Sequence, residues 1–202
     1  MDYRSILDRI LQTVDEEAYV TPLRRIGGEE GLAVGLVRES MRQQGWDPEQ
    51  VRSLIQRLES EGRMRRVTAL SALHIVAAHP KVANWAEAAR LAGEQELAAL
   101  EEGGPDLNHN LASVDRHRGV IAFQRGFYEN ALDNFGRALE RERSAANLGN
   151  ILSTLIRLRE EDEARSLLIQ IRASYPAALV EELDTYILQD HDLALLRTEN
   201  AP

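Results

Sequence analysis

The side chains best suited to proton transfer or metal binding near neutral pH are five histidines spread along the 202 residues. None shows the paired helical spacing of a zinc or metalloprotease motif. His74 and His79 are five residues apart, so their rings would not lie one above the other on a helix. We therefore expect all five to be structural or exposed: His74, His79, His109, His117 and His191.

Other chemistry is also missing from the sequence. Gly27-Gly28 is followed by two glutamates and no lysine, and Gly103-Gly104-Pro105 lacks a preceding strand, so both are better explained as turns than as phosphate loops. Cysteine is absent, which excludes disulfides, thiolate nucleophiles and cysteine zinc sites. The sequence therefore predicts no catalytic, cofactor-binding or metal-binding residue, and we do not expect an enzyme.

The composition favours an all-α protein. Aromatic residues make up only 5% of the chain, alanine and leucine dominate, and runs of β-branched residues are scarce. The formal net charge of −9 opposes nonspecific attraction to nucleic acid or to an anionic membrane. No apolar run approaches the roughly 20 residues that span a bilayer, and Met1 to Val14 lacks a signal-peptide core, so we expect a cytoplasmic protein.

The first third of the chain is predicted to form amphipathic helices. Apolar stripes indicate helices over Tyr3 to Glu17 and Glu29 to Gln44. A third helix starts after Asp47, a favoured N-cap residue, and stops at Gly62. The following run, Thr68 to His79, is too short to distinguish helix from strand by periodicity.

The second and third helices, followed by Glu61 to Val67, resemble the helix-turn-helix and first wing strand of winged-helix DNA-binding domains. The resemblance implies a small β-wing near 63–78, whose second strand would come from Leu73 to Ala78. The alternative is a packed helical cap with a solvated arginine edge. In the DNA-binding alternative, phosphate contacts would come from five arginines: Arg52, Arg57, Arg63, Arg65 and Arg66.

A break is predicted between two parts of the chain. Lys81 to Glu101 is expected to be a helix, and Gly103 to Asn110 a loop. We place the joint in this loop or near Pro80, which gives an N-terminal helical domain at 1–80 and a repeat domain at 81–202. The sequence leaves open whether residues 69–102 form a further repeat.

Residues from Leu111 to Pro176 show an internal repeat. Moving on by 33 residues, the small and large apolar positions of one segment recur in the next: Ala131, Phe135 and Ala138 become Ala164, Leu168 and Ile171. With Gly119 on the preceding helix and a turn at Gly126, this pattern resembles the tetratricopeptide repeat, a helix-turn-helix unit of about 34 residues. The resemblance implies an all-α fold in which a helical bundle leads into a short α-solenoid of about two repeats, closed by a terminal helix over Ala177 to Gln189.

The repeat also predicts how individual side chains pack. Ala131 and Ala164 are expected at close helix crossings, and Phe135 is expected to fill the volume between helix pairs. Ala145, at the start of the following helix, lies outside this register and is expected to face water, so that Ala145→Leu would be close to neutral.

The same resemblance implies a function. It indicates a non-enzymatic interaction module or adaptor whose first repeat helices line a groove for a peptide or helix of another protein. Asn150 and Arg116 suit a carboxylate clamp, but Val120 stands where that clamp has an asparagine, so we expect a mixed apolar and polar groove. One alternative is a transcription regulator with residues 1–78 on DNA and the repeats used for dimerisation or sensing, and another is an oligomeric scaffold, such as a homo-oligomer. The groove residues would be Arg116, Val120, Phe123, Gln124, Asn150, Ser153 and Arg157.

Overall fold

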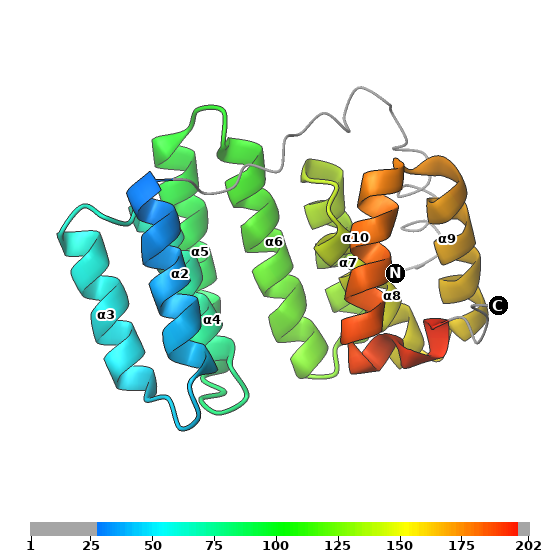
Figure 1. Cartoon of the computed structure of the whole chain (residues 1–202), viewed down its shortest axis with the longest axis horizontal. Helices are drawn as coiled ribbons and strands as arrows, with labels where there is room; N and C mark the ends of the chain where they lie inside the picture. The colour runs from blue at the N-terminus through cyan, green and yellow to red at the C-terminus, as the bar shows by residue number, and fades with distance from the viewer. Residues whose placement is uncertain (1–27, 198–202) are drawn as a thin grey trace. The chain divides into compact units, whose positions relative to one another are not determined.

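The computed structural model of the protein describes residues 28–197 (Figure 1). Over this range the protein is all-α, with nine α-helices and one 3₁₀-helix packed sequentially and antiparallel, and without β-strands. The helix expected over Tyr3 to Glu17 lies outside the described residues. The elements are α2 (Gly28–Arg42), α3 (Pro48–Ser60), α4 (Arg66–Ala78), α5 (Trp85–Glu102), α6 (Leu107–Gln124), α7 (Tyr128–Arg141), α8 (Ala145–Arg157), α9 (Glu161–Ser174), α10 (Ala177–Gln189) and η2 (His191–Leu196).

The described residues fall into two compact units, 28–117 and 118–197, and the division lies within α6. The domain joint predicted near Pro80 or in the 103–110 loop stays a prediction, because compactness does not show where a separately folding domain ends. None of the helices in the described part of the chain is long and apolar enough to cross a membrane.

In the unit of residues 28–117, α3 begins as its sequence predicts. The Asp47 carboxylate accepts a hydrogen bond from the Glu49 backbone N–H at 3.0 Å, and Pro48 is the first helical residue. The apolar face of α3 is buried through Val51, Ile55 and Leu58, which pack in a core with α2. The apolar face of α3 therefore packs against both α2 and α4.

The predicted β-wing near 63–78 is wrong, because residues 66–78 form helix α4 and residues 63–65 lie in the turn before it. Arg65 is the N-cap residue, and seven of the thirteen residues of α4 are buried. The helix packs against both α3 and α5, so apolar residues occur on most of its sides. A helix covered on several sides lacks the one-sided periodicity that identifies an amphipathic helix, which explains the ambiguous pattern.

The turn before α5 is longer than the sequence suggested, since α5 begins at Trp85 and not at Lys81. The Asn84 side chain caps the helix by accepting from the Glu87 N–H at 3.2 Å. The Lys81 ammonium group contacts the Trp46 carbonyl oxygen and lies 5.2 Å from the centroid of the Trp46 ring. These contacts tie the turn to the loop before α3.

The loop between α5 and α6 is shorter than predicted. Gly103 and Gly104 both have positive φ angles, 59° and 75°, which a glycine adopts without strain. Helix α6 begins at Leu107, and the Asn110 N–H donates to the Asp106 carbonyl at 2.9 Å. The residues after 106 that were expected to form a loop therefore belong to the first turns of α6.

In the unit of residues 118–197, the predicted apolar register is buried. Residues of α7 and α9 at the repeated positions are all at most 4% exposed. Gly119 of α6 allows a close approach: a Cβ added there would lie 2.5 Å from Cε1 of the Phe135 ring. The glycine is therefore required by packing and not by a turn. The buried positions are Ala131, Phe135, Ala138, Ala164, Leu168 and Ile171.

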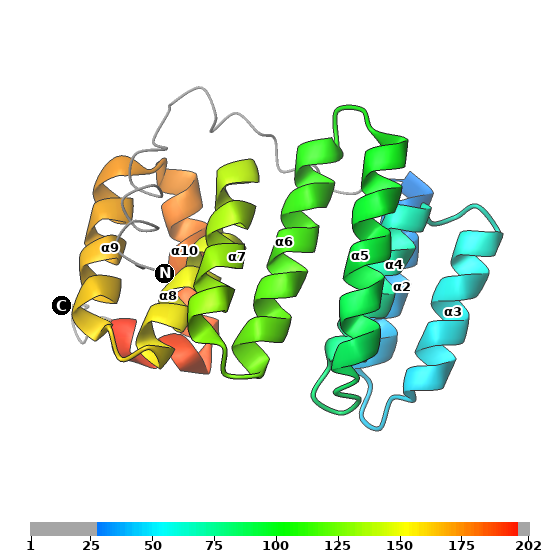
Figure 2. The same cartoon turned by 180° about the vertical axis from the view of Figure 1, so that it is seen from behind.

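The expectation that Ala145 faces water is wrong, because its side chain is only 1% exposed. Helix α8 lies between α7 and α9 (Figure 2) and also packs against α10 and η2. Nine of its thirteen residues are buried, so even its first turn is enclosed. The terminal helix α10, with the predicted bounds, provides part of this cover through Leu183 and Ile187.

Candidate binding pocket

A pocket of about 180 Å³ opens in the unit of residues 118–197. Three helices and the corner between α10 and η2 contribute to its wall. Its lining residues are Val120, Phe123 and Gln124 of α6, Phe135 of α7, Asn150 and Ser153 of α8, and Asp190 and Asp192 at the corner. The wall therefore combines three apolar side chains, three neutral polar ones and two carboxylates.

Five of the seven residues predicted for a groove line this pocket. A sixth, Arg157, does not line it but donates to the Asp192 carboxylate at 2.6 Å. The seventh, Arg116, is not among the lining residues. The sequence did not indicate Asp190 or Asp192, because both follow the repeat and reach the pocket only where the chain turns back after α10. The five are Val120, Phe123, Gln124, Asn150 and Ser153.

The aromatic side chains of the pocket wall pack against neighbouring parts of the protein. Phe135 is 2% exposed, and its ring packs against the backbone at Gly119. Phe123 is half-buried and meets the Tyr128 ring edge-on, with the centroids 5.4 Å apart. Aromatic side chains fixed in this way offer an apolar surface with little conformational freedom left to lose on binding.

Two of the three neutral polar residues, Asn150 and Ser153, come from one face of α8. Asn150 Oδ1 accepts a hydrogen bond from the Tyr186 hydroxyl at 3.4 Å, and Tyr186 in turn packs against Gly149. Ser153 is 5% exposed, and its Oγ has no hydrogen-bond partner within the described residues. A buried hydroxyl without a partner is unfavourable, so Ser153 marks a place where a guest could add a hydrogen bond.

The two carboxylates differ in how they are engaged. Asp192 Oδ1 accepts from Arg157 Nη2, and that guanidinium carbon lies 6.0 Å from the Phe123 ring centroid. Asp190 Oδ1 accepts from the Asp192 backbone N–H at 2.9 Å and thereby caps η2. Within residues 28–197 the Asp190 carboxylate forms no ion pair, whereas Asp192 does.

A second polar cluster lies inside the unit of residues 28–117. The rings of His74 and His117 are stacked with centroids 3.9 Å apart and an interplanar angle of 12°. His74 Nδ1 is 2.9 Å from the Ala88 carbonyl oxygen, and His117 Nδ1 is 2.9 Å from Gln95 Oε1. Both histidines are buried, and the structural role expected for them stays a prediction.

Burial also controls the charge of this histidine pair. It lowers the pKa of His74 to about 4, with the hydrogen bond to the Ala88 carbonyl opposing the shift. It lowers the pKa of His117 well below its ordinary value, and the nearby His74 and Arg116 act in the same direction. Both rings are therefore neutral at pH 7, and they donate or accept as neutral imidazoles.

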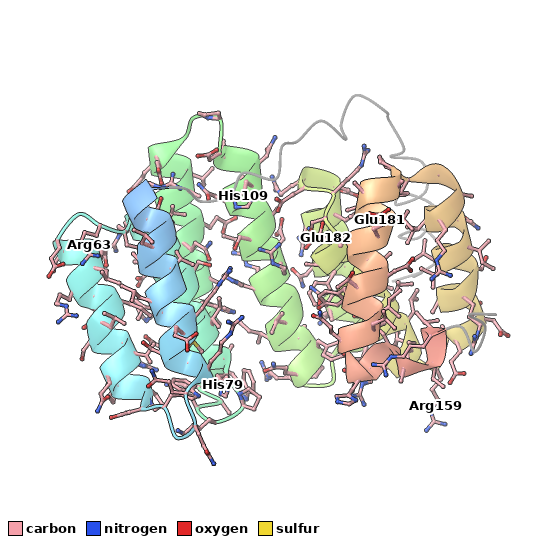
Figure 3. All side chains as sticks on the ribbon, in the orientation of Figure 1. Arg63, His79, His109, Arg159, Glu181 and Glu182 are labelled. Carbon is pink, nitrogen blue, oxygen red and sulfur yellow. The ribbon has the colours of Figure 1, made fainter. Side chains whose placement is uncertain are left out.

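The arginines predicted for DNA contact are engaged by carboxylates of their own unit. Arg65 reaches Glu30 at 3.0 Å, Glu102 at 2.8 Å and Asp106 at 3.6 Å. Arg63, in the turn after α3 (Figure 3), lies 3.5 Å from Glu61. The remaining pairs are Arg52 with Glu49, Arg57 with Glu61, and Arg66 with Glu59.

Among residues 28–197, no three histidine, aspartate or glutamate side chains gather closely enough to hold a metal ion. Comparison with known proteins found no protein-family model, no curated protein and no solved structure that matches the chain.

Proposed function

We propose that this protein is a non-enzymatic interaction module that binds a segment of another protein in the pocket of residues 118–197. The main support is the pocket itself, which brings together five residues that the repeat pattern selected from separate helices. The resemblance of residues 111–176 to tetratricopeptide repeats agrees with this function, since that family binds peptides and helices in grooves of the same kind.

The mixture of groups in the wall suits a peptide. Fixed aromatic and aliphatic side chains provide an apolar contact surface, and a small number of polar groups can orient a guest. The unpartnered hydroxyl of Ser153 distinguishes this pocket from an apolar packing gap between helices. An apolar gap offers no hydrogen bond to a polar guest, whereas this hydroxyl does.

The proposal can be tested by selecting random displayed peptides on the full chain and measuring the affinities of the enriched ones by calorimetry. Gln124 is exposed and lines the pocket, so Gln124→Trp should obstruct the opening without disturbing the core. We expect it to weaken binding by about tenfold or more, equivalent to about 1.4 kcal/mol.

Gln56→Trp is the matched control, because Gln56 is an exposed glutamine on α3 in the other unit. It should leave the affinities unchanged. The proposal fails if no peptide is enriched, or if the enriched peptides bind the Gln124→Trp and Gln56→Trp variants equally well.

No observation in the described part of the chain favours the DNA-binding alternative. Its five arginines all have carboxylate partners, and residues 66–78 form a helix where the wing would be. Binding of DNA by residues 1–78 stays a prediction, and so does the oligomeric scaffold.

A further inference from the structure

The two carboxylates at the corner between α10 and η2 differ in their partners. Asp192 is paired with Arg157, whereas the Asp190 carboxylate forms no ion pair within residues 28–197, and Arg197 Nη2 donates to the Asp190 backbone carbonyl at 3.0 Å. One oxygen of Asp190 caps η2 and the other accepts no hydrogen bond from the described residues. This oxygen can therefore accept a charge-assisted hydrogen bond from a cationic guest.

The second observation is the lack of a hydrogen-bond partner for the Ser153 hydroxyl within the described residues. Serine and threonine inside a helix commonly donate to the carbonyl oxygen four residues earlier. Thr154 does so, donating to the Asn150 carbonyl at 2.6 Å. The neighbouring Ser153 makes no such bond, although it is 95% buried (5% exposed) and lines the pocket. Its hydroxyl is left with both a donor and acceptor sites for a guest.

The remaining wall suits an aliphatic stem. Val120, Phe123 and Phe135 face the same pocket as the two polar groups. A side chain that is apolar along its length and charged at its tip could bury its methylene groups here while its tip reaches Asp190.

We propose that the pocket binds a lysine side chain of the partner segment, with its ammonium group at Asp190 and Ser153 and its stem against the three apolar residues. This inference rests on the function proposed above. An ammonium group carries three donors, and it needs only single acceptors. The acidic chain, with a formal net charge of −9, also favours the approach of a basic segment.

An arginine guest fits the pocket less well. A guanidinium group binds most strongly to a carboxylate that presents both oxygens to its fork. In the pocket, one acceptor site of Asp190 is occupied by the Asp192 N–H and one of Asp192 by Arg157, which leaves fewer sites for a two-point contact. A point donor is therefore favoured over a planar fork.

The experiment is a double-mutant cycle on peptides selected with the wild-type chain. Each lysine of an enriched peptide is replaced in turn by norleucine, which keeps the stem and removes the ammonium group. The protein partner in the cycle is Asp190→Asn, because asparagine preserves the cap of η2 and removes the charge. Calorimetry gives the affinity for each combination.

We expect one lysine-to-norleucine change to weaken binding to the wild-type chain by about tenfold or more, as for the loss of a charged hydrogen bond. The same change should have little effect on binding to Asp190→Asn. Glu182→Gln is the control: it removes one negative charge from α10 at an exposed position that does not line the pocket (Figure 3). Its cycle should show no coupling to the lysine.

Other outcomes overturn the inference in distinguishable ways. Additive effects of norleucine and Asp190→Asn, or enriched peptides that need arginine or no basic residue but still lose binding to Gln124→Trp, refute the lysine site and leave the interaction function standing. A selection without enriched peptides refutes the interaction function and the lysine site together.

Discussion

The two polar clusters of this protein differ in what their buried groups contact. In the unit of residues 28–117, the stacked pair His74 and His117 makes its hydrogen bonds to Ala88, Gln95 and Ser71 within the same unit. In the unit of residues 118–197, Ser153 and Asp190 border a pocket and keep unused hydrogen-bonding capacity within the described residues.

This difference separates two uses of buried polarity. A polar cluster that is mostly satisfied inside the protein specifies how helices pack, and it makes stability depend on pH. A polar group that borders a pocket and lacks a hydrogen-bond partner lowers the stability of the folded protein. A bound guest that supplies the missing hydrogen bond removes this cost. Mutations should therefore affect stability in the first cluster and binding in the second, except where one residue serves both the core and the pocket.

Phe135 is such a shared residue, and its truncation should have the largest effect. Phe135→Ala removes a ring that is 2% exposed and leaves a cavity, so we expect a loss of about 3–5 kcal/mol in the free energy of unfolding. Urea denaturation of the full chain measures it. Phe127→Ala is the control, because that ring is 51% exposed and its loss should change stability by less than about 0.5 kcal/mol.

Acidification should destabilise the histidine cluster. Because the pKa of His74 is about 4 in the folded protein and about 6.5 when exposed, the unfolded chain binds more protons between these values. The stabilisation is complete above about pH 6.5 and falls as the pH drops, by about 2 kcal/mol between pH 8 and pH 5 for this ring alone. His117 changes in the same direction.

Urea denaturation at the two pH values tests this expectation. His74→Phe should flatten the dependence, and His191→Gln, which removes an exposed histidine, should preserve it. Equal stability of the wild-type chain at pH 8 and pH 5 would show that folding does not lower the pKa of the histidine pair.

A matched pair of glycines tests the packing behind the pocket. At Gly119 a Cβ would lie 2.5–2.9 Å from three carbons of the Phe135 ring, whereas at Gly93 of α5 nothing lies within 4 Å. Gly119→Ala should cost about 1–3 kcal/mol through overpacking, less the helix propensity gained. Gly93→Ala should stabilise by about 0.5–1 kcal/mol, because alanine favours a helix interior over glycine.

Thermal denaturation measures both changes: the melting temperature should fall for Gly119→Ala and rise for Gly93→Ala. Adding Phe135→Leu to Gly119→Ala should recover part of the loss, since the smaller side chain makes room. Two glycine variants with the same sign would contradict the close contact between α6 and α7.

The smallest expected changes in stability come from replacing two arginines, Arg65 and Arg157. The Arg65 side chain is 41% exposed and reaches three carboxylates, and that of Arg157 is 48% exposed and reaches one. Arg65→Met should cost about 1 kcal/mol and Arg157→Met less than about 0.5 kcal/mol, because exposed ion pairs contribute little unless they form a network. Melts at low and high salt should show the larger salt dependence for Arg65.

The repeat made the apolar register of α7 and α9 predictable. Large and small residues recur at a fixed spacing, and this fixes which face of each helix is covered. Ala145 could not be placed in the same way, since alanine occurs on any face of a helix. In addition, α8 is packed against several elements, two of which, α10 and η2, lie far along the chain. The wing prediction failed because α4, covered from two sides, has no one-sided pattern.

The five residues of α6 and α8 that line the pocket could be selected from the sequence because the two helices occupy equivalent positions in the repeat pattern. Asp190 and Asp192 were not, because only the return of the chain after α10 places them beside α8. The stacking of His74 on His117 likewise depends on packing between helices that no local sequence pattern encodes.

The turn before α5 bears on recognition between copies of the protein. Lys81 is the only lysine in the 202 residues, and its ammonium group is already held by the carbonyl oxygen and ring of Trp46. A pocket that selects lysine therefore finds no free example on another copy of the same chain. Because all the other residues among the 24 lysines and arginines are arginine, a lysine-selective pocket would distinguish a foreign segment from another copy of the chain.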